Sequence, residues 1–245
     1  MHDMFGRIRH LSLRCILLWI AGAGLGLYPA PAAAAADDIV LYSSDVTRMS
    51  GAWTRVSSKE GAGGEIMTTP DQGFTAASPL ASPTHFFEVK FEAAAGTSYH
   101  VWLRLRAAKN QAANDSVWVQ FSDALDQADK PVWRIGTASA LLVNLESCQN
   151  CGVSGWGWQD GAFWITQDAV VRFPTTGTHT MRIQTREDGV QVDQIVLSPA
   201  SYMSSSPGAL LNDATILSKT TTSATTMAQA SAPEIVLYAA DATAW

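Results

Sequence analysis

Residues 99–106 alternate between apolar and polar side chains, a pattern that suits a β-strand with one buried face. The apolar members are Tyr99, Val101, Leu103 and Leu105. Successive side chains of a strand point to opposite faces, so period-two alternation indicates a sheet packed on a core through one side. Trp102 is the exception, because it is a large aromatic residue on the polar side. The chain is therefore expected to fold around β-sheets.

Similar short segments follow one another along most of the chain. We expect further strands at residues 38–42, 53–57, 85–93, 116–122, 131–135, 170–173, 179–186 and 190–197. The turn Glu187-Asp188-Gly189 suits a tight hairpin between the last two strands. No segment carries a helical pattern of about 12 residues. These features predict an all-β fold, an antiparallel two-sheet β-sandwich.

The chain contains a repeat of its own opening strand. Residues 38–45 read DIVLYSSD, and residues 234–241 read EIVLYAAD. Thr and then an Ala-Trp pair follow in both places. Such self-similarity is typical of modules joined in tandem, so residues 234–245 are interpreted as the start of a truncated second repeat. Linked copies gain avidity, which favours a binding role over a catalytic one and makes neighbouring repeat modules expected partners.

The first 36 residues have the pattern of a signal peptide. Arg7, Arg9 and Arg14 precede an apolar run over residues 15–27, and small residues follow at 32–36. Such a segment is removed on export, so no membrane span is expected after cleavage. The mature protein is expected to be secreted, extracellular or at the cell surface, with the periplasm also open.

The remaining chain divides by composition. Residues 37–203 are expected to form the β-sandwich domain. Residues 204–233 are rich in Ser, Thr and Ala, with prolines near both ends. A segment of that composition buries little apolar surface, so it is interpreted as a disordered linker to the next repeat.

Charge and cysteine content narrow the partners and the compartment. The net charge is −6, which argues against nucleic acid as a partner. Beyond the signal peptide only Cys148 and Cys151 remain. Outside the cytosol a lone nearby pair is most simply a disulfide, and here it would stiffen one loop.

The segment after these cysteines is the richest candidate site. It combines indoles with glycines and polar side chains, and the ligand-binding candidates in it are Trp156, Trp158, Gln159, Asp160 and Trp164. Sugars stack C–H faces on indole rings while their hydroxyls pair with amides and carboxylates. The alternative is that the indoles belong to the packed interior.

A second group of candidates lies around the strand at 116–122. Its alternation places Trp118 on the face away from the core, and Asn114 and Asp115 lead into it. These three residues are candidates for ligand binding. The alternative is a turn in which Asp115 accepts backbone N–H groups.

Asp193 lies in an otherwise apolar strand, where a carboxylate needs a partner. One candidate is a structural calcium ion shared with Asp45, and the other is an arginine such as Arg186. No nucleophile motif or singled-out pair of carboxylates accompanies the histidines, so no enzyme is expected.

Several of these motifs together resemble a known family. They are the alternating run from Tyr99, Asn114-Asp-Ser-Val-Trp, Trp156-Gly-Trp158, and the ending Gly-Thr-His-Thr with a Glu-Asp-Gly turn and Asp193-Gln-Ile-Val-Leu. Residues 38–198 resemble the galactose-binding-like jelly rolls and, within them, carbohydrate-binding module families 6 and 35.

The resemblance implies a jelly-roll sandwich, often with a structural calcium near the first and last strands. Asp193 matches the acidic residue of the last strand, and Trp156, Trp158 and Trp164 fall in the aromatic loop region. The first strand departs from the family, which often has Glu-x-Glu where this chain has residues 41–45.

The sequence therefore predicts an exported, non-catalytic carbohydrate-binding module, one copy of a tandem array, that holds a polysaccharide or glycan through its Trp-rich loop. Two alternatives stay open. One is a structural or adhesive spacer of a bacterial surface protein. The other is an accessory domain of a secreted enzyme.

Overall fold

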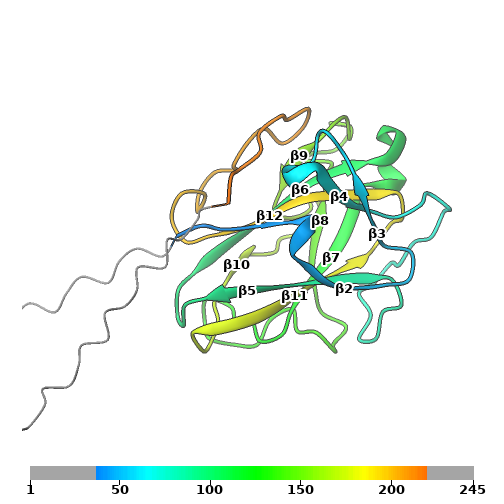
Figure 1. Cartoon of the computed structure of the whole chain (residues 1–245). Helices are drawn as coiled ribbons and strands as arrows, with labels where there is room; N and C mark the ends of the chain where they lie inside the picture. Colours follow the sequence, from blue (N-terminus) through cyan, green and yellow to red (C-terminus); the bar gives the residue numbers. More distant parts are fainter. Residues whose placement is uncertain (1–36, 220–245) are drawn as a thin grey trace, which may run out of the picture. The chain divides into compact units, whose positions relative to one another are not determined.

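A computed structural model describes residues 37–219, which form two antiparallel β-sheets packed face to face (Figure 1). The first sheet has the order β10 (Val170–Val171), β6 (Tyr99–Ala107), β12 (Val190–Ser198), β4 (Glu65–Thr68), β3 (Thr54–Ser57), with β1 (Ile39–Tyr42) also paired to β12 and β9 (Gly157–Gln159) to β6. The second has the order β2 (Val46–Ser50), β5 (Phe86–Ala93), β11 (Gly177–Thr185), β7 (Ser116–Phe121), β8 (Leu141–Asn144). Short 3-10 turns lie at η1 (Ser43–Asp45), η2 (Ala62–Gly64), η3 (Ala108–Asn110) and η4 (Ala112–Asn114). The predicted antiparallel sandwich is confirmed.

The core lies between the sheets and follows the alternation of the sequence. On β6, Val101, Leu103 and Leu105 are fully buried, and they share one apolar cluster with Phe87 and Val89 of β5. Each such side chain stabilises the fold by about 1.5–3 kcal/mol when it leaves water. The period-two pattern thus sets the inner face of both sheets.

The predicted hairpin between the last two strands is wrong. β11 pairs with β5 and β7 in the second sheet, whereas β12 pairs with β6 and β1 in the first. The turn between them carries the chain from one sheet to the other. Gly189 adopts φ 78° there, and the Asp188 carboxylate accepts N–H bonds from Gln72 and Gly73 at 2.8 and 3.1 Å.

The sequence misplaced one strand and missed four. Residues 131–135 form only isolated bridges, and Trp133 there has φ 43°, outside the extended region. β2, β4, β8 and β9 were not predicted. β8 and β9 are buried on both faces, so they lack the alternation that marks a half-exposed strand.

Residues 199–219, here called the strap, run along the outer side of the first sheet (orange in Figure 1). The Leu217 N–H donates to Gln194 Oε1 at 3.0 Å, and Gln194 Nε2 donates to the Leu217 carbonyl at 2.7 Å. Tyr202 and Leu217 pack on a cluster formed by Trp102, Trp158 and Val196. The prediction of a linker from residue 204 is therefore wrong up to residue 219, because a few apolar and hydrogen-bonding side chains are enough to fix a polar segment on a sheet.

Several predictions fall outside residues 37–219. The signal peptide at 1–36, the rest of the linker at 220–233 and the second repeat at 234–245 are among them. Within the described part of the chain, no helix is long and apolar enough to cross a membrane.

Candidate ligand-binding site

Trp158, a residue expected to stack on sugar, is part of the interior. It lies in β9 with no exposed surface, and it packs with Trp102 and Val196 beneath the strap. Gln159 follows it in β9, where its amide donates at 2.9 Å to the carbonyls of Leu145 and Leu210. Neither side chain of this pair is free to take a ligand as the sequence suggested.

Trp156 is also unavailable for stacking. Two guanidinium groups lie over its ring, that of Arg104 at 4.8 Å and that of Arg106 at 4.4 Å from the ring centroid. The Trp156 residue is 4 % exposed. Its indole N–H donates to Glu60 at 3.3 Å. Cations over an indole face stabilise the fold electrostatically. The prediction that Trp156 and Trp158 bind sugar is therefore wrong, and the alternative interior role is confirmed.

The candidates around β7 are covered as well. The Trp118 ring lies on the face away from the main core, as predicted, but it is buried in a cluster with Ala140, Leu142 and Ala162, and its N–H donates to the Ala76 carbonyl at 3.0 Å. Asn114 is 2 % exposed and donates to the Ala108 carbonyl at 3.1 Å. A ligand-binding role for Trp118 and Asn114 is not compatible with this burial.

Asp115 has an unusual environment instead of a ligand-facing one. It is 1 % exposed, and Asn144 Nδ2 donates to its Oδ1 at 2.6 Å. Burial, followed by the hydrogen bond and negative charge of Glu187, raises the pKa of Asp115 to about 8. Ser116 Oγ donates to Glu187 at 2.6 Å. The Glu187 carboxylate thus lies near enough to disfavour the charged form of Asp115. None of these contacts is the alternative expected from the sequence, a turn in which Asp115 accepts backbone N–H groups.

A calcium ion shared by Asp193 and Asp45 does not fit these residues. Asp193 accepts the Ala62 N–H at 2.6 Å and forms an ion pair with the buried guanidinium of Arg104. Asp45 accepts the Tyr42 N–H at 2.7 Å and pairs with Lys219 at 2.6 Å. Among residues 37–219, no group of three potential metal-ligating side chains occurs. Asp193 thus has an arginine partner, although it is Arg104 and not Arg186.

The third indole of the loop is exposed. Phe163, Trp164 and Ile165 are 44 %, 49 % and 46 % exposed and follow one another in a turn closed by an Ile165 N–H bond to the Ala162 carbonyl at 3.1 Å. The Phe163 and Trp164 rings meet edge to face with centroids 4.9 Å apart. The Arg186 guanidinium lies 5.9 Å from the Trp164 ring. We call residues 163–165 the aromatic turn.

A hollow of about 350 Å³ adjoins the aromatic turn. Its lining combines apolar and polar groups, chiefly Trp102, Phe163, Leu210, Glu146, Asp160 and Gln167. Asp160 pairs with His100 at 2.8 Å. Such a mixture of apolar surface with a few polar groups is typical of small-ligand sites.

The predicted disulfide between Cys148 and Cys151 is present, with Cα atoms 5.2 Å apart. The exposed turn that it closes begins directly after Glu146 and Ser147, both of which line the hollow. The disulfide therefore stiffens one margin of the hollow.

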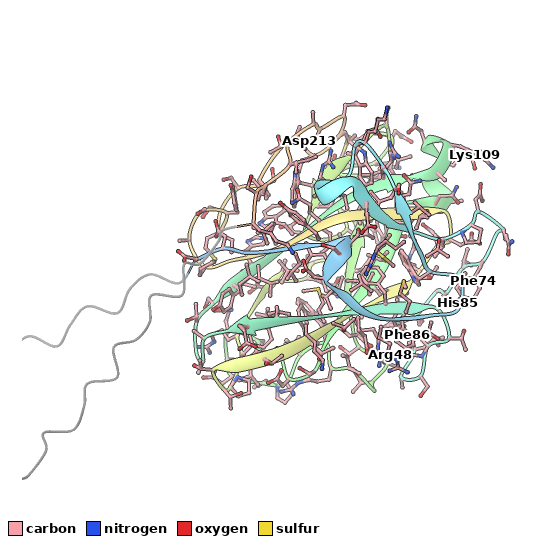
Figure 2. All side chains as sticks on the ribbon, in the orientation of Figure 1. Arg48, Phe74, His85, Phe86, Lys109 and Asp213 are labelled. Atoms are coloured by element: carbon pink, nitrogen blue, oxygen red, sulfur yellow. A yellow bond between two sulfur atoms is a disulfide. The ribbon has the colours of Figure 1, made fainter. Side chains whose placement is uncertain are left out.

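A second aromatic cluster lies among loops near the start of β5, where Phe74 and His85 are labelled together in Figure 2. Their ring centroids are 5.0 Å apart, and close by Arg48 stacks on Phe86 at 4.9 Å. The hollow beside Phe74 measures about 40 Å³, little more than the volume of one water molecule. It is too small for a sugar ring.

Sequence reasoning thus named two exposed members of the site, Asp160 and Trp164, and missed Glu146, Phe163 and His100. The available signal was the run Phe163-Trp164-Ile165, three consecutive large apolar residues followed by the polar pair Thr166-Gln167. In the structure this run lies in an exposed turn, whereas the glycine-flanked Trp156 and Trp158 before it are buried.

No family model matches this sequence, and no curated protein matches it. Several solved structures share a similar arrangement. The GH26-CBM35 β-(1,4)-mannanase of Podospora anserina is 12 % identical with a TM-score of 0.43; the match covers 67 % of this chain and 28 % of the mannanase chain. The carbohydrate-binding modules expected from the sequence are among the structures found.

Two of them are isolated modules. The C-terminal CBM6 of the laminarinase LamC from Zobellia galactanivorans is 11 % identical, with a TM-score of 0.38 over 66 % of this chain and 99 % of that one. A family 35 module from Clostridium thermocellum is 10 % identical, with a TM-score of 0.33 over 65 % and 97 %.

Proposed function

We propose that this protein is a non-catalytic module that binds glycan at the aromatic turn and the adjoining hollow. One observation carries the proposal: three consecutive large apolar side chains, each nearly half exposed, stand beside a hollow of about 350 Å³ that contains two carboxylates. Exposed apolar surface of this kind, bordered by polar groups, marks binding sites in proteins of this size.

The chemistry of the turn suits a sugar. The rings of Phe163 and Trp164 offer flat apolar surface for the C–H groups of a pyranose. Glu146 and Asp160 offer carboxylate oxygens that accept hydrogen bonds from sugar hydroxyls, and bonds to charged acceptors are the stronger kind. Apolar stacking and hydroxyl recognition are thus available side by side.

The support beneath the turn is rigid. The Asn144 N–H donates to the Gly161 carbonyl at 2.9 Å, and the Leu142 N–H donates to Gln167 Oε1 at 2.9 Å. Gln167 Nε2 donates to the Ala140 carbonyl at 3.0 Å. These bonds tie both ends of the turn to β8, so little conformational freedom is lost on binding.

The test is affinity electrophoresis of residues 37–219 through gels containing laminarin, β-1,4-mannan or β-1,3-galactan. We expect retardation in at least one gel. Trp164→Ala or Phe163→Ala should lower the affinity for that glycan about tenfold. Phe74→Ala is the matched control, since Phe74 is an exposed aromatic residue outside the site. Equal mobility in all gels, from protein shown to be folded, would contradict the proposal.

A second candidate is docking of the aromatic turn on a neighbouring module or protein. The observation in its favour is that Ile165 and Leu210 add exposed aliphatic surface at the same place. Under either function, export rests on the pattern at residues 1–36, and a tandem array rests on the repeat at 234–241.

A further inference from the structure

His100 joins the proposed glycan site to the strap. It lies on β6, where its Nε2 is 2.8 Å from Oδ2 of Asp160 and its Nδ1 is 2.9 Å from the carbonyl oxygen of Met203. The ring stacks on Trp102, with centroids 4.6 Å apart and an angle of 12° between planes. One imidazole therefore contacts a residue of the hollow on one side and the strap on the other.

Both neighbours of this ring are acceptors. A carboxylate oxygen and a carbonyl oxygen have no proton to give, so each contact requires an N–H on the histidine. A neutral imidazole has one N–H, whereas the imidazolium has two. The geometry is fully satisfied only when His100 is protonated.

The surroundings favour that state. Burial acts against the charged ring, but the hydrogen bonds to Asp160 and Met203 and the negative charges of Asp160 and Asp168 outweigh it and raise the pKa of His100 above its ordinary 6.5. On the other neighbouring strand, β12, the residue opposite is Ser198, which donates to Asp38 at 2.6 Å. The charged side chains facing the ring are thus acidic.

We infer that protonated His100 is the positioning residue of the glycan site, holding Asp160 in the hollow and anchoring the strap through Met203. The inference rests on the proposed function. When the ring loses a proton it keeps a single N–H, so one of the two bonds is lost. The Asp160 carboxylate then faces a neutral ring instead of an imidazolium, so Asp160 is held less firmly and glycan affinity falls.

The experiment compares affinity in laminarin, β-1,4-mannan and β-1,3-galactan gels at pH 5.5 and pH 8.5. We expect affinity to fall about tenfold across this range, the effect of one charge-assisted hydrogen bond. His100→Gln, which does not titrate, should bind with intermediate affinity and lose the pH dependence. His85→Gln is the matched control, because His85 is a half-buried histidine that accepts a single bond, from the Ala52 N–H at 3.0 Å.

A ligand-free readout accompanies the gels. In an NMR titration of the imidazole signals, Asp160→Asn should lower the pKa of His100. Retention that is equal at both pH values, or a His100 pKa that does not respond to Asp160→Asn, would overturn the role of His100 while leaving the glycan site standing. No retention at either pH would overturn both.

Discussion

Arg104 and Asp193 form an ion pair in which both side chains are buried, 2 % and 0 % exposed, at the outer side of the first sheet. The guanidinium also donates to the carbonyls of Glu60 and Asp213, each at 3.1 Å. Asp213, labelled in Figure 2, belongs to the strap. This one arginine thus connects β6, β12, the turn after β3 and the strap.

Removing the arginine should destabilise the fold strongly. Arg104→Met leaves the Asp193 carboxylate buried without its partner, which costs about 3–5 kcal/mol. Equilibrium unfolding in urea measures the change. Arg48→Met is the matched control, because the Arg48 side chain is 61 % exposed in its pair with Glu88 and surface pairs contribute about 0–1 kcal/mol. A loss below 1 kcal/mol for Arg104→Met would contradict the assigned role.

The strap should be essential although its composition suggests a linker. A chain ending at residue 203 loses Asp213 and Leu217, so Arg104 loses an acceptor and Trp158 becomes exposed. We expect a loss of more than about 3 kcal/mol relative to a chain ending at residue 219, with a red shift of tryptophan emission. Equal stability of the two chains would show that the strap is dispensable.

Sequence alone gave the strand type and the inner faces of the sheets, because period-two alternation reports a half-buried strand directly. The prediction from sequence failed where a segment distant in the chain determines whether a side chain is exposed. Trp156 and Trp158 have the composition of a sugar platform, but residues far along the chain cover them, and no local pattern encodes that cover. Asp193 was correctly expected to need a partner, yet Arg104 could not be chosen over Arg186 because strand order is not written in local spacing.

Asp115 should make stability depend on pH. Its pKa is raised from 3.8 to about 8 in the folded state, so the folded state binds the proton more tightly than the unfolded one. The resulting stability is complete below pH 3.8 and is lost as pH rises towards 8. Asp115→Asn keeps the shape of the protonated carboxyl and should flatten this decline.

Urea unfolding of both proteins at pH 5 and pH 8 is the measurement. The control is Asp129→Asn, which changes a carboxylate paired with Arg172 at the surface. Its stability should change between pH 5 and pH 8 as that of the wild type does. If the stability of Asp115→Asn declined with pH as steeply as that of the wild type, the burial of Asp115 beside Glu187 would not be the source of the decline.

The hollow should discriminate against acidic glycans. Glu146 and Asp160 line it, and its lining residues include no lysine or arginine. A uronate placed there would bring a like charge close to two carboxylates, of which only Asp160 has a counter-charge, in His100, and this repulsion lowers affinity. We therefore expect polygalacturonate gels to leave the protein unretarded under conditions in which a neutral glycan retards it.

The charge of Glu146 can be tested separately from its shape. Glu146→Gln removes one carboxylate. It should narrow the difference in retardation between gels of neutral and of acidic glycan, most clearly at low salt, where charge repulsion is least screened. Glu65→Gln, on β4 away from the hollow, is the matched control and should leave the difference unchanged. Strong retention by polygalacturonate in the unaltered protein would place the binding surface elsewhere, since the carboxylates of this hollow offer an acidic sugar no favourable contact.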